Sequence, residues 1–135
     1  MSTTWEVVQR ADDGERVGYL APGPGGDGLV VPMTLAGTPA GEPGPVAEAT
    51  ALLVAQGLAL LARRWWCRMP DPLPAGRTDV ASPAVDWPWR PAVLVEVSAQ
   101  QVRLRPEWPA PEELTARAVL PVPAGELLRG SQPVG

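Results

Sequence analysis

Residues 44–70, GPVAEATALLVAQGLALLARRWWCRMP, decide the fold that the sequence predicts. A Gly-Pro pair begins the stretch, Glu48 lies where the helix dipole favours an anion, and Arg63 and Arg64 stand at the other end. This pattern predicts one principal α-helix. Its apolar positions recur at steps of three and four, which predicts one continuous buried stripe. The stripe consists of Ala47, Ala51, Val54, Leu58, Leu61 and Trp65.

Three leucines lie outside this stripe, on the opposite side of the helix. Leu52, Leu53 and Leu60 are neighbours there of the polar residues Gln56 and Arg63. A helix with one buried face would not carry three leucines on its other face. We therefore expect these leucines to be covered by the rest of the chain or by a second subunit, and they are candidates for an interface.

The stretch RRWWCR, which follows the helix, reads as the start of a strand. Side chains alternate along a strand, so this stretch would have one inward and one outward group. The inward group is Trp65, Cys67 and Met69, and the outward group is Arg64, Trp66 and Arg68. An indole beside guanidinium groups can bind an anion or stack on a base. The simpler interpretation is that the arginines cover Trp66 within the fold or pair with nearby acids.

A β-meander is predicted before the helix. WEVVQR and RVGYLA read as two strands joined by ADDGE, where Gly14 supplies the positive φ of a tight turn. LVVPMTL reads as a third strand. Because proline has no N–H to donate, this strand is expected to lie at an edge or to end at Pro32. The expected buried face of the meander is Trp5, Val7, Val17 and Tyr19.

A second hairpin is predicted in AVLVEVSAQQVRLRP, residues 92–106. Pairing Val97 with Val102 places Glu96 opposite Arg103, as a cross-strand ion pair, and Val95 opposite Leu104. The apolar face is then Val93, Val95, Val97, Val102 and Leu104. A short helix at 110–117, a strand at 118–122 and a helical turn at 124–130 complete the expected elements.

These elements predict an α+β fold, a mostly antiparallel curved sheet or open barrel of about six strands packed on one principal α-helix. Residues 1–135 are expected to form a single small globular domain, with a Pro-rich loop at 70–91 and a short irregular C-terminal tail. Loops of that length are usually functional or disordered.

The end of this loop, DWPWRP, resembles a recognition platform. Its prolines hold two indoles, Trp87 and Trp89, with Asp86 and Arg90 at the margins. Aromatic residues and arginine are enriched in interface hot spots, so these residues are interaction candidates. The alternative is that the two tryptophans fill a small hydrophobic core.

The composition argues against the common catalytic schemes. The chain has no His, the commonest general base and transition-metal ligand, no Lys for a Schiff base, and one cysteine, Cys67. The carboxylates Asp71, Asp79, Asp86, Glu112 and Glu113 match no calcium-loop spacing. We therefore predict no catalytic residue, no metal and no cofactor, and lean against an enzyme. The absence of Lys, Ile, Phe and Asn, whose codons are AT-rich, indicates a GC-rich genome.

Charge and hydropathy limit the classes of partner that the sequence allows. A net charge of −4 and a pI near 4.8 make nucleic acid an unlikely main partner, since phosphate binding needs a basic surface. MSTTWEVVQR lacks the pattern of a signal peptide, and residues 49–62 are shorter than the roughly 20 residues that span a bilayer. We expect a cytoplasmic protein without membrane contact, whose partner is another protein or a second copy of itself.

The sequence thus favours a non-catalytic protein-interaction domain with an accessory or regulatory role, able to self-associate. One alternative is a small-ligand binder or carboxylate-based enzyme with a pocket at the tryptophan loop. The other is a weak binder of single-stranded nucleic acid or anions. That site would need Arg64, Trp66, Arg68, Arg103 and Arg105 to converge on one exposed face.

Overall fold

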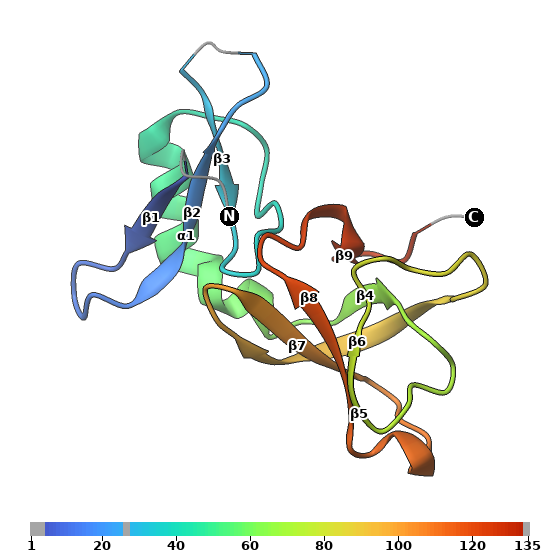
Figure 1. Ribbon diagram of the computed structural model, residues 1–135. Coiled ribbons are helices and arrows are strands. Elements are labelled where there is room, and N and C mark those ends of the chain that lie inside the picture. Colours follow the sequence, from blue (N-terminus) through green and yellow to red (C-terminus); the bar gives the residue numbers. More distant parts are fainter. Residues whose placement is uncertain (1–4, 26–27, 134–135) are drawn as a thin grey trace. The chain divides into compact units, whose positions relative to one another are not determined.

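The computed structural model describes residues 5–25 and 28–133, and the chain divides into two compact units, Met1–Leu61 and Ala62–Gly135. Within the described residues it contains nine β-strands, one α-helix and two short 3-10 turns. The strands form two sheets, of order β1-β2-β3 and β5-β8-β7-β6-β4-β9 (Figure 1). The α+β class is therefore confirmed. The expected single sheet of about six strands on one helix is wrong, and the six-stranded sheet is not closed into a barrel, since its edge strands β5 and β9 are not paired with each other.

The first unit begins with the predicted meander of three antiparallel strands, β1 (Glu6–Gln9), β2 (Arg16–Pro22) and β3 (Val30–Met33). Gly14 has φ 69° in the turn, and β3 lies at the edge of the sheet, as Pro32 predicts. The predicted buried face is only partly right, because Val17 and Tyr19 are buried whereas Val7 is exposed and Val8 is buried. Apolar residues occupy both faces of β2, so alternation alone does not identify the face that meets the helix.

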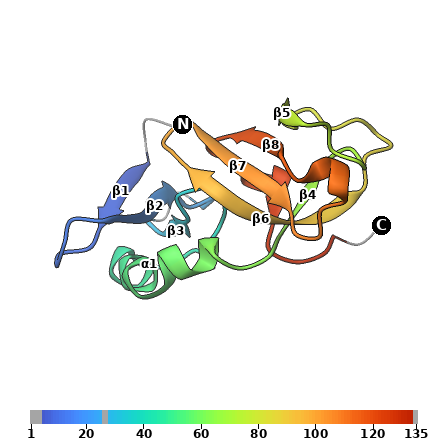
Figure 2. The same cartoon turned by 90° about the horizontal axis from the view of Figure 1, so that it is seen from below.

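Helix α1 (Val46–Leu61) packs on this sheet, where Figure 2 shows it running beside the three strands. The predicted stripe is wrong: Leu53 has an exposed fraction of 0%, while Val54 is 42% exposed. Two glycines explain the choice of face. A Cβ atom at Gly57 would lie 2.2 Å from the carbonyl oxygen of Val17, and one at Gly18 would lie 2.8 Å from a methyl group of Leu53. The helix therefore turns its Gly57 side to β2, because only that side allows so close an approach.

The second unit holds the six-stranded sheet. Its strands are β4 (Trp65–Arg68), β5 (Gly76–Asp79), β6 (Trp89–Val97), β7 (Gln101–Pro106), β8 (Ala116–Pro121) and β9 (Leu128–Arg129). All neighbours are antiparallel except β5 and β8, which are parallel. The 3-10 turns are Pro111–Glu113 and Gly125–Leu127, so the short helix expected at 110–117 is a single turn. The segment 70–91 is not structureless throughout, because it contains β5.

The expected alternation in β4 and the expected β6–β7 hairpin are both present. Trp65, Cys67 and Met69 are buried, as predicted. Val97 pairs with Val102 and Glu96 with Arg103. A register shift between Leu94 and Glu96 places Leu94 opposite Leu104, so the predicted Val95 pairing is wrong and Val95 is exposed. No helix among residues 5–25 and 28–133 combines the length and the hydropathy needed to cross a bilayer.

Candidate functional site: a tryptophan–arginine pocket

The register of β4 with its two neighbours brings three separate stretches of sequence together. Trp66 on β4 pairs with Pro91 on β6 and with Arg129 on β9, and Arg68 pairs with Trp89. Directly paired residues of antiparallel strands have their side chains on the same face of a sheet. Two tryptophans and two arginines, which are far apart along the chain, therefore share one face of the second unit.

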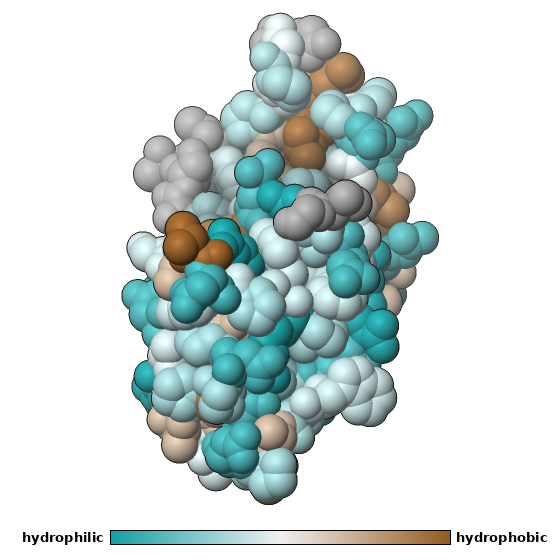
Figure 3. Space-filling view, turned by 90° about the vertical axis from the view of Figure 1, so that its right-hand side faces the viewer, coloured by the Kyte–Doolittle hydropathy of each residue, from teal (hydrophilic) through white to brown (hydrophobic). Residues whose placement is uncertain are grey.

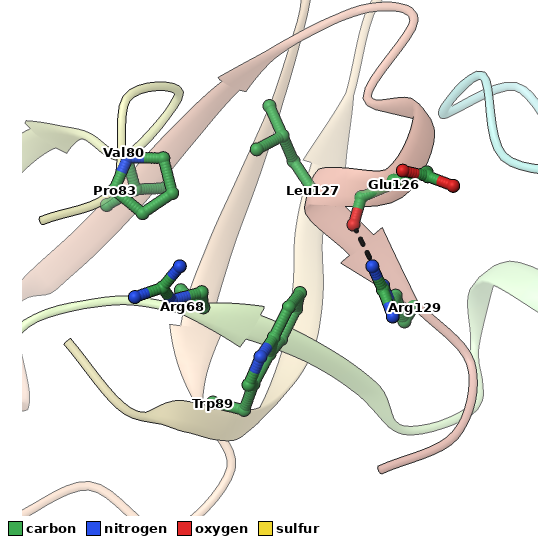
Figure 4. A pocket seen from close by; sticks show the side chains of 7 residues that line it. All are labelled: Arg68, Val80, Pro83, Trp89, Glu126, Leu127 and Arg129. Atoms are coloured by element: carbon green, nitrogen blue, oxygen red, sulfur yellow. Dashed lines mark hydrogen bonds between the residues drawn. The ribbon is translucent and has the colours of Figure 1, made fainter. Parts of the chain in front are cut away.

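Arg68, Trp89 and Arg129 line a hollow of about 260 Å³. Its other lining residues are Val80, Pro83, Glu126 and Leu127. Figure 4 shows the indole of Trp89 between the two guanidinium groups, with apolar side chains on the opposite wall. A second hollow, of about 510 Å³, shares Arg68 and Trp89 with the first. Its remaining lining residues are Val85, Trp87, Pro88, Gln132 and Pro133. The two hollows together are named the tryptophan–arginine pocket.

Arg129 is held over the Trp89 ring. Its guanidinium carbon lies 5.0 Å from the centroid of the indole, within the range of a cation–π interaction. Its Nε donates a hydrogen bond of 3.2 Å to the backbone carbonyl of Glu126 (Figure 4). Within the described part of the chain, the two terminal nitrogens of Arg129 donate no hydrogen bond. They are thus oriented in advance and can receive a carboxylate.

Arg68 fixes the loop that carries Trp87. Its Nη2 donates to the carbonyls of Ala84 and Val85, at 3.0 and 3.1 Å, and its Nε donates to the carbonyl of Trp87 at 3.2 Å. Carbonyl groups are neutral, so these bonds position the guanidinium without cancelling its charge. Arg68 therefore orders one wall of the pocket and also makes the pocket more positive.

Arg64 and Trp66, the other two residues of the outward group, are only partly available to a ligand. Arg64 pairs with Glu107 through Nε and through Nη2, whose distance to Oε1 is 2.9 Å. This pair raises the pKa of Arg64 and lowers that of Glu107, in both cases chiefly through the hydrogen bond between them. Trp66 is half-buried. The arginine beside Trp66 at the start of β4 is therefore occupied by an acid.

The side chain of Arg90 is largely buried, with an exposed fraction of 12%, and it pairs with an acid of its own unit. Its Nη1 and Nη2 donate to Oε2 and Oε1 of Glu113 at 2.6 and 2.9 Å. The Glu113 carboxylate also accepts the backbone N–H groups of Leu73, at 2.6 Å, and Ala110, at 2.9 Å. The side chain of Glu113 is buried, and its pKa falls to about 2, mainly because of the hydrogen bond from Arg90. This network links the β4–β5 connection, through Leu73, and the β7–β8 connection, through Ala110, to Arg90 on β6. Its role is therefore structural.

Two of the three candidate leucines of α1, Leu52 and Leu53, pack against their own unit. Leu53 is buried against Gly18, and Leu52 lies so close to Gly41 that a Cβ there would be 2.8 Å from its Cδ2. Leu52 and Leu60 are half-buried. The sequence leaves open whether Leu52 and Leu53 are covered by the rest of the chain or by a second subunit. In the structure, the chain itself covers them.

The carboxylates of the long loop do not converge. Oδ1 of Asp79 accepts the backbone N–H of Ala81 at 2.8 Å, and Asp71 lies 3.9 Å from Arg90. The described residues contain no group of three or more His, Cys, Asp or Glu side chains that could hold a metal ion. Burial raises the pKa of the Cys67 thiol to about 12, so this thiol is not poised as a nucleophile.

On the face seen in Figure 3, hydrophilic residues predominate and hydrophobic residues occur as separate groups. No family model, no curated protein and no solved structure matches this chain. Sequence reasoning found Arg68, Trp87 and Trp89 but missed Arg129. The stretch LLRG offers only a two-residue strand, too short for alternation to be recognised.

Proposed function

We propose that the protein is a non-catalytic interaction module that binds an extended, acidic segment of a protein partner in the tryptophan–arginine pocket. The observation that carries this proposal is the stacking of Arg129 on Trp89, with the terminal nitrogens of the guanidinium making no hydrogen bond among the described residues. A carboxylate can bind there in a bidentate manner. Trp and Arg are also the residues that most often dominate interface energetics.

The shape of the pocket supports an extended segment. Residues two apart in an extended chain point to the same side and lie about 6.6 Å apart. The two hollows share Arg68 and Trp89, so one segment can place a carboxylate beside Arg129 and an apolar side chain beside Trp87. Aromatic-lined grooves bind extended segments, and arginine clusters bind acidic motifs.

A compact anionic ligand is the second candidate. The larger hollow, of about 510 Å³, falls within the roughly 300–1,000 Å³ that is common for small-molecule sites. The smaller one, of about 260 Å³, lies below it, and this favours the protein segment. Screening small carboxylates by thermal shift distinguishes the two: stabilisation by such a ligand, lost in Trp89→Ala, would favour the second candidate.

The proposal is tested with a displayed library of random peptides, selected on the wild-type protein and counter-selected on Trp89→Ala. We expect enrichment of peptides with Asp or Glu next to an apolar residue. Arg129→Lys should weaken their binding about tenfold, because lysine keeps the charge but loses the planar fork. Arg16→Lys, an exposed position on β2, is the matched control and should bind normally. Failure to enrich any peptide whose binding depends on Trp89 would contradict the proposal.

A further inference from the structure

A row of three arginines crosses adjacent strands of the six-stranded sheet, outside the tryptophan–arginine pocket. Arg77 on β5 and Arg117 on β8 are direct partners in the parallel ladder. Leu104 on β7 pairs with Ala118 on β8 in an antiparallel ladder. This register places the next residue of β7, Arg105, opposite the preceding residue of β8, Arg117. Arg77, Arg117 and Arg105 are named the arginine row. Neighbouring strands lie about 4.8 Å apart, so three like charges are placed close together.

Among the residues that the structure describes, none of the three arginines of the row belongs to an ion pair. One acid, Glu107, whose pKa is lowered chiefly by its hydrogen bond with another arginine, lies near enough to Arg105 for Arg105 to help lower that pKa. Arg117 donates to the carbonyl of Ala116 at 2.8 Å, and Arg105 donates to the carbonyl of Pro106 at 3.2 Å. Like charges placed side by side on neighbouring strands destabilise a sheet. An anionic ligand would remove this repulsion.

The distribution of charge along the chain also favours an anionic ligand at the arginine row. The second unit contains nine of the eleven arginines but only eight of the fifteen acidic residues. The acidic excess of the protein therefore lies in the first unit, and the second unit has one more cationic than anionic side chain. The net charge of −4 thus does not describe the surface around the arginine row.

An exposed indole lies at the same end of these strands. Trp108 follows β7 by two residues, in the connection from β7 to β8, and is 73% exposed. Arg105 lies near the end of β7, and Arg117 near the start of β8. The connection that carries Trp108 thus joins the strand ends that carry two members of the row. An exposed tryptophan in a connection between arginine-bearing strand ends is a feature of surfaces on which unpaired bases stack.

We propose that the arginine row and Trp108 bind single-stranded nucleic acid. The arginines would contact phosphates, and a base would stack on the indole of Trp108. A single strand is the committed ligand because stacking on the indole needs a base that is not enclosed in a duplex. Three phosphate contacts predict a slope of about −2 for the logarithm of the binding constant against the logarithm of salt concentration.

The test is the fluorescence anisotropy of a short labelled oligouridylate, titrated with the full-length protein over a series of salt concentrations. We expect micromolar affinity at low salt and the stated slope. Arg77→Ser with Arg117→Ser should reduce the affinity at least about tenfold and the slope to about −0.7. Trp108→Ala should also reduce the affinity about tenfold. The matched control, Arg10→Ser with Arg16→Ser, removes two charges from the first unit and should change the affinity less than about twofold.

Each remaining outcome overturns the inference. Absence of binding to the wild type would do so, as would equal losses in both double variants, since only net charge would then matter. If the corresponding duplex binds as well as the single strand, or if Trp108→Ala binds normally, the ligand is a polyanion in general and the single-strand assignment is wrong. Circular dichroism of each variant tests whether the fold is retained. The pocket variant Trp89→Ala should bind the oligonucleotide normally, which separates this inference from the proposed peptide site.

Discussion

At the scale of single residues, the buried pair of Arg90 and Glu113 controls the stability of the second unit. Two charges from Arg90 and Glu113 lie in the interior, and the carboxylate accepts two backbone N–H groups besides the guanidinium. Removing one member of such a pair leaves the other charged and buried, which costs about 3–5 kcal/mol. Sequence reasoning assigned Arg90 to the surface because the partner lies 23 residues away.

We therefore predict that Glu113→Gln lowers the free energy of unfolding by about 3 kcal/mol near pH 7. Glu112→Gln, the exposed neighbour, should change it by less than about 0.5 kcal/mol. Urea denaturation followed by tryptophan fluorescence measures both values. A loss in Glu113→Gln no larger than in Glu112→Gln would contradict the structural role of the pair.

The same carboxylate predicts a dependence of stability on pH. The pKa of Glu113 is about 2 in the folded protein, below the 4.5 of a free glutamate side chain, so the folded state favours the ionised form. The stability from this group is complete above the unfolded pKa and is lost as the pH falls from about 4.5 towards 2. Wild type and Glu113→Gln should therefore differ most in urea midpoint near neutral pH and converge on acidification. A difference that stays constant down to pH 2 would contradict this assignment.

Cys67 gives a third prediction at this scale. With its pKa raised to about 12 from 9.0, the buried thiol has roughly a thousandfold less thiolate near pH 8 than an exposed one. We expect Ellman's reagent to modify the native protein far more slowly than the protein in guanidinium chloride. Equally fast modification in both conditions would show that the thiol is exposed.

At the scale of elements, the contact of α1 with β2 depends on glycine. Helix propensity favours alanine over glycine by about 1 kcal/mol, so Gly57→Ala would stabilise an isolated helix. In this protein the added methyl group would lie 2.2 Å from the carbonyl oxygen of Val17. We predict that Gly57→Ala lowers the free energy of unfolding by about 2 kcal/mol, because the helix must move away from the strand.

Ala59→Gly, at an exposed position of α1, is the control for helix propensity alone. It should lower the free energy of unfolding by about 1 kcal/mol. Thermal denaturation of both variants measures these effects. If Gly57→Ala stabilises the protein, the close contact of the helix with β2 does not exist.

Local sequence patterns predicted most of the helices and strands. They did not predict which face of an element is buried or which strands pair over long distances in the chain. The meander, the principal helix, β4 and the β6–β7 hairpin follow from turn residues and periodicity within short windows. The orientation of α1 could not be predicted, because apolar residues surround the helix and Gly57 decides which side meets the strand. Strand β5 was missed because its sequence, GRTD, has no apolar residue and its partner β8 lies about 40 residues away.

At the scale of the whole molecule, both proposed sites arise from long-range strand pairing. Arg68 and Trp89 were candidates from sequence, but their union with Arg129 depends on β9 pairing with β4. The arginine row likewise depends on the order β5-β8-β7. Net charge made nucleic acid an unlikely partner for the whole chain, yet charge is not shared evenly between the two units. The single folding domain expected for residues 1–135 and the capacity to self-associate stay predictions.

The most direct test of the central claim uses the six tryptophans as reporters. Their indole N–H signals can be followed in proton–nitrogen NMR spectra and assigned with single Trp→Phe variants. On titration with a selected acidic peptide, we predict that the signals of Trp87 and Trp89 shift and saturate together, while those of Trp5 and the buried Trp65 stay in place. If the Trp87 and Trp89 signals do not move while the peptide binds, or if it binds equally well to Trp89→Ala, the tryptophan–arginine pocket is not the interaction site.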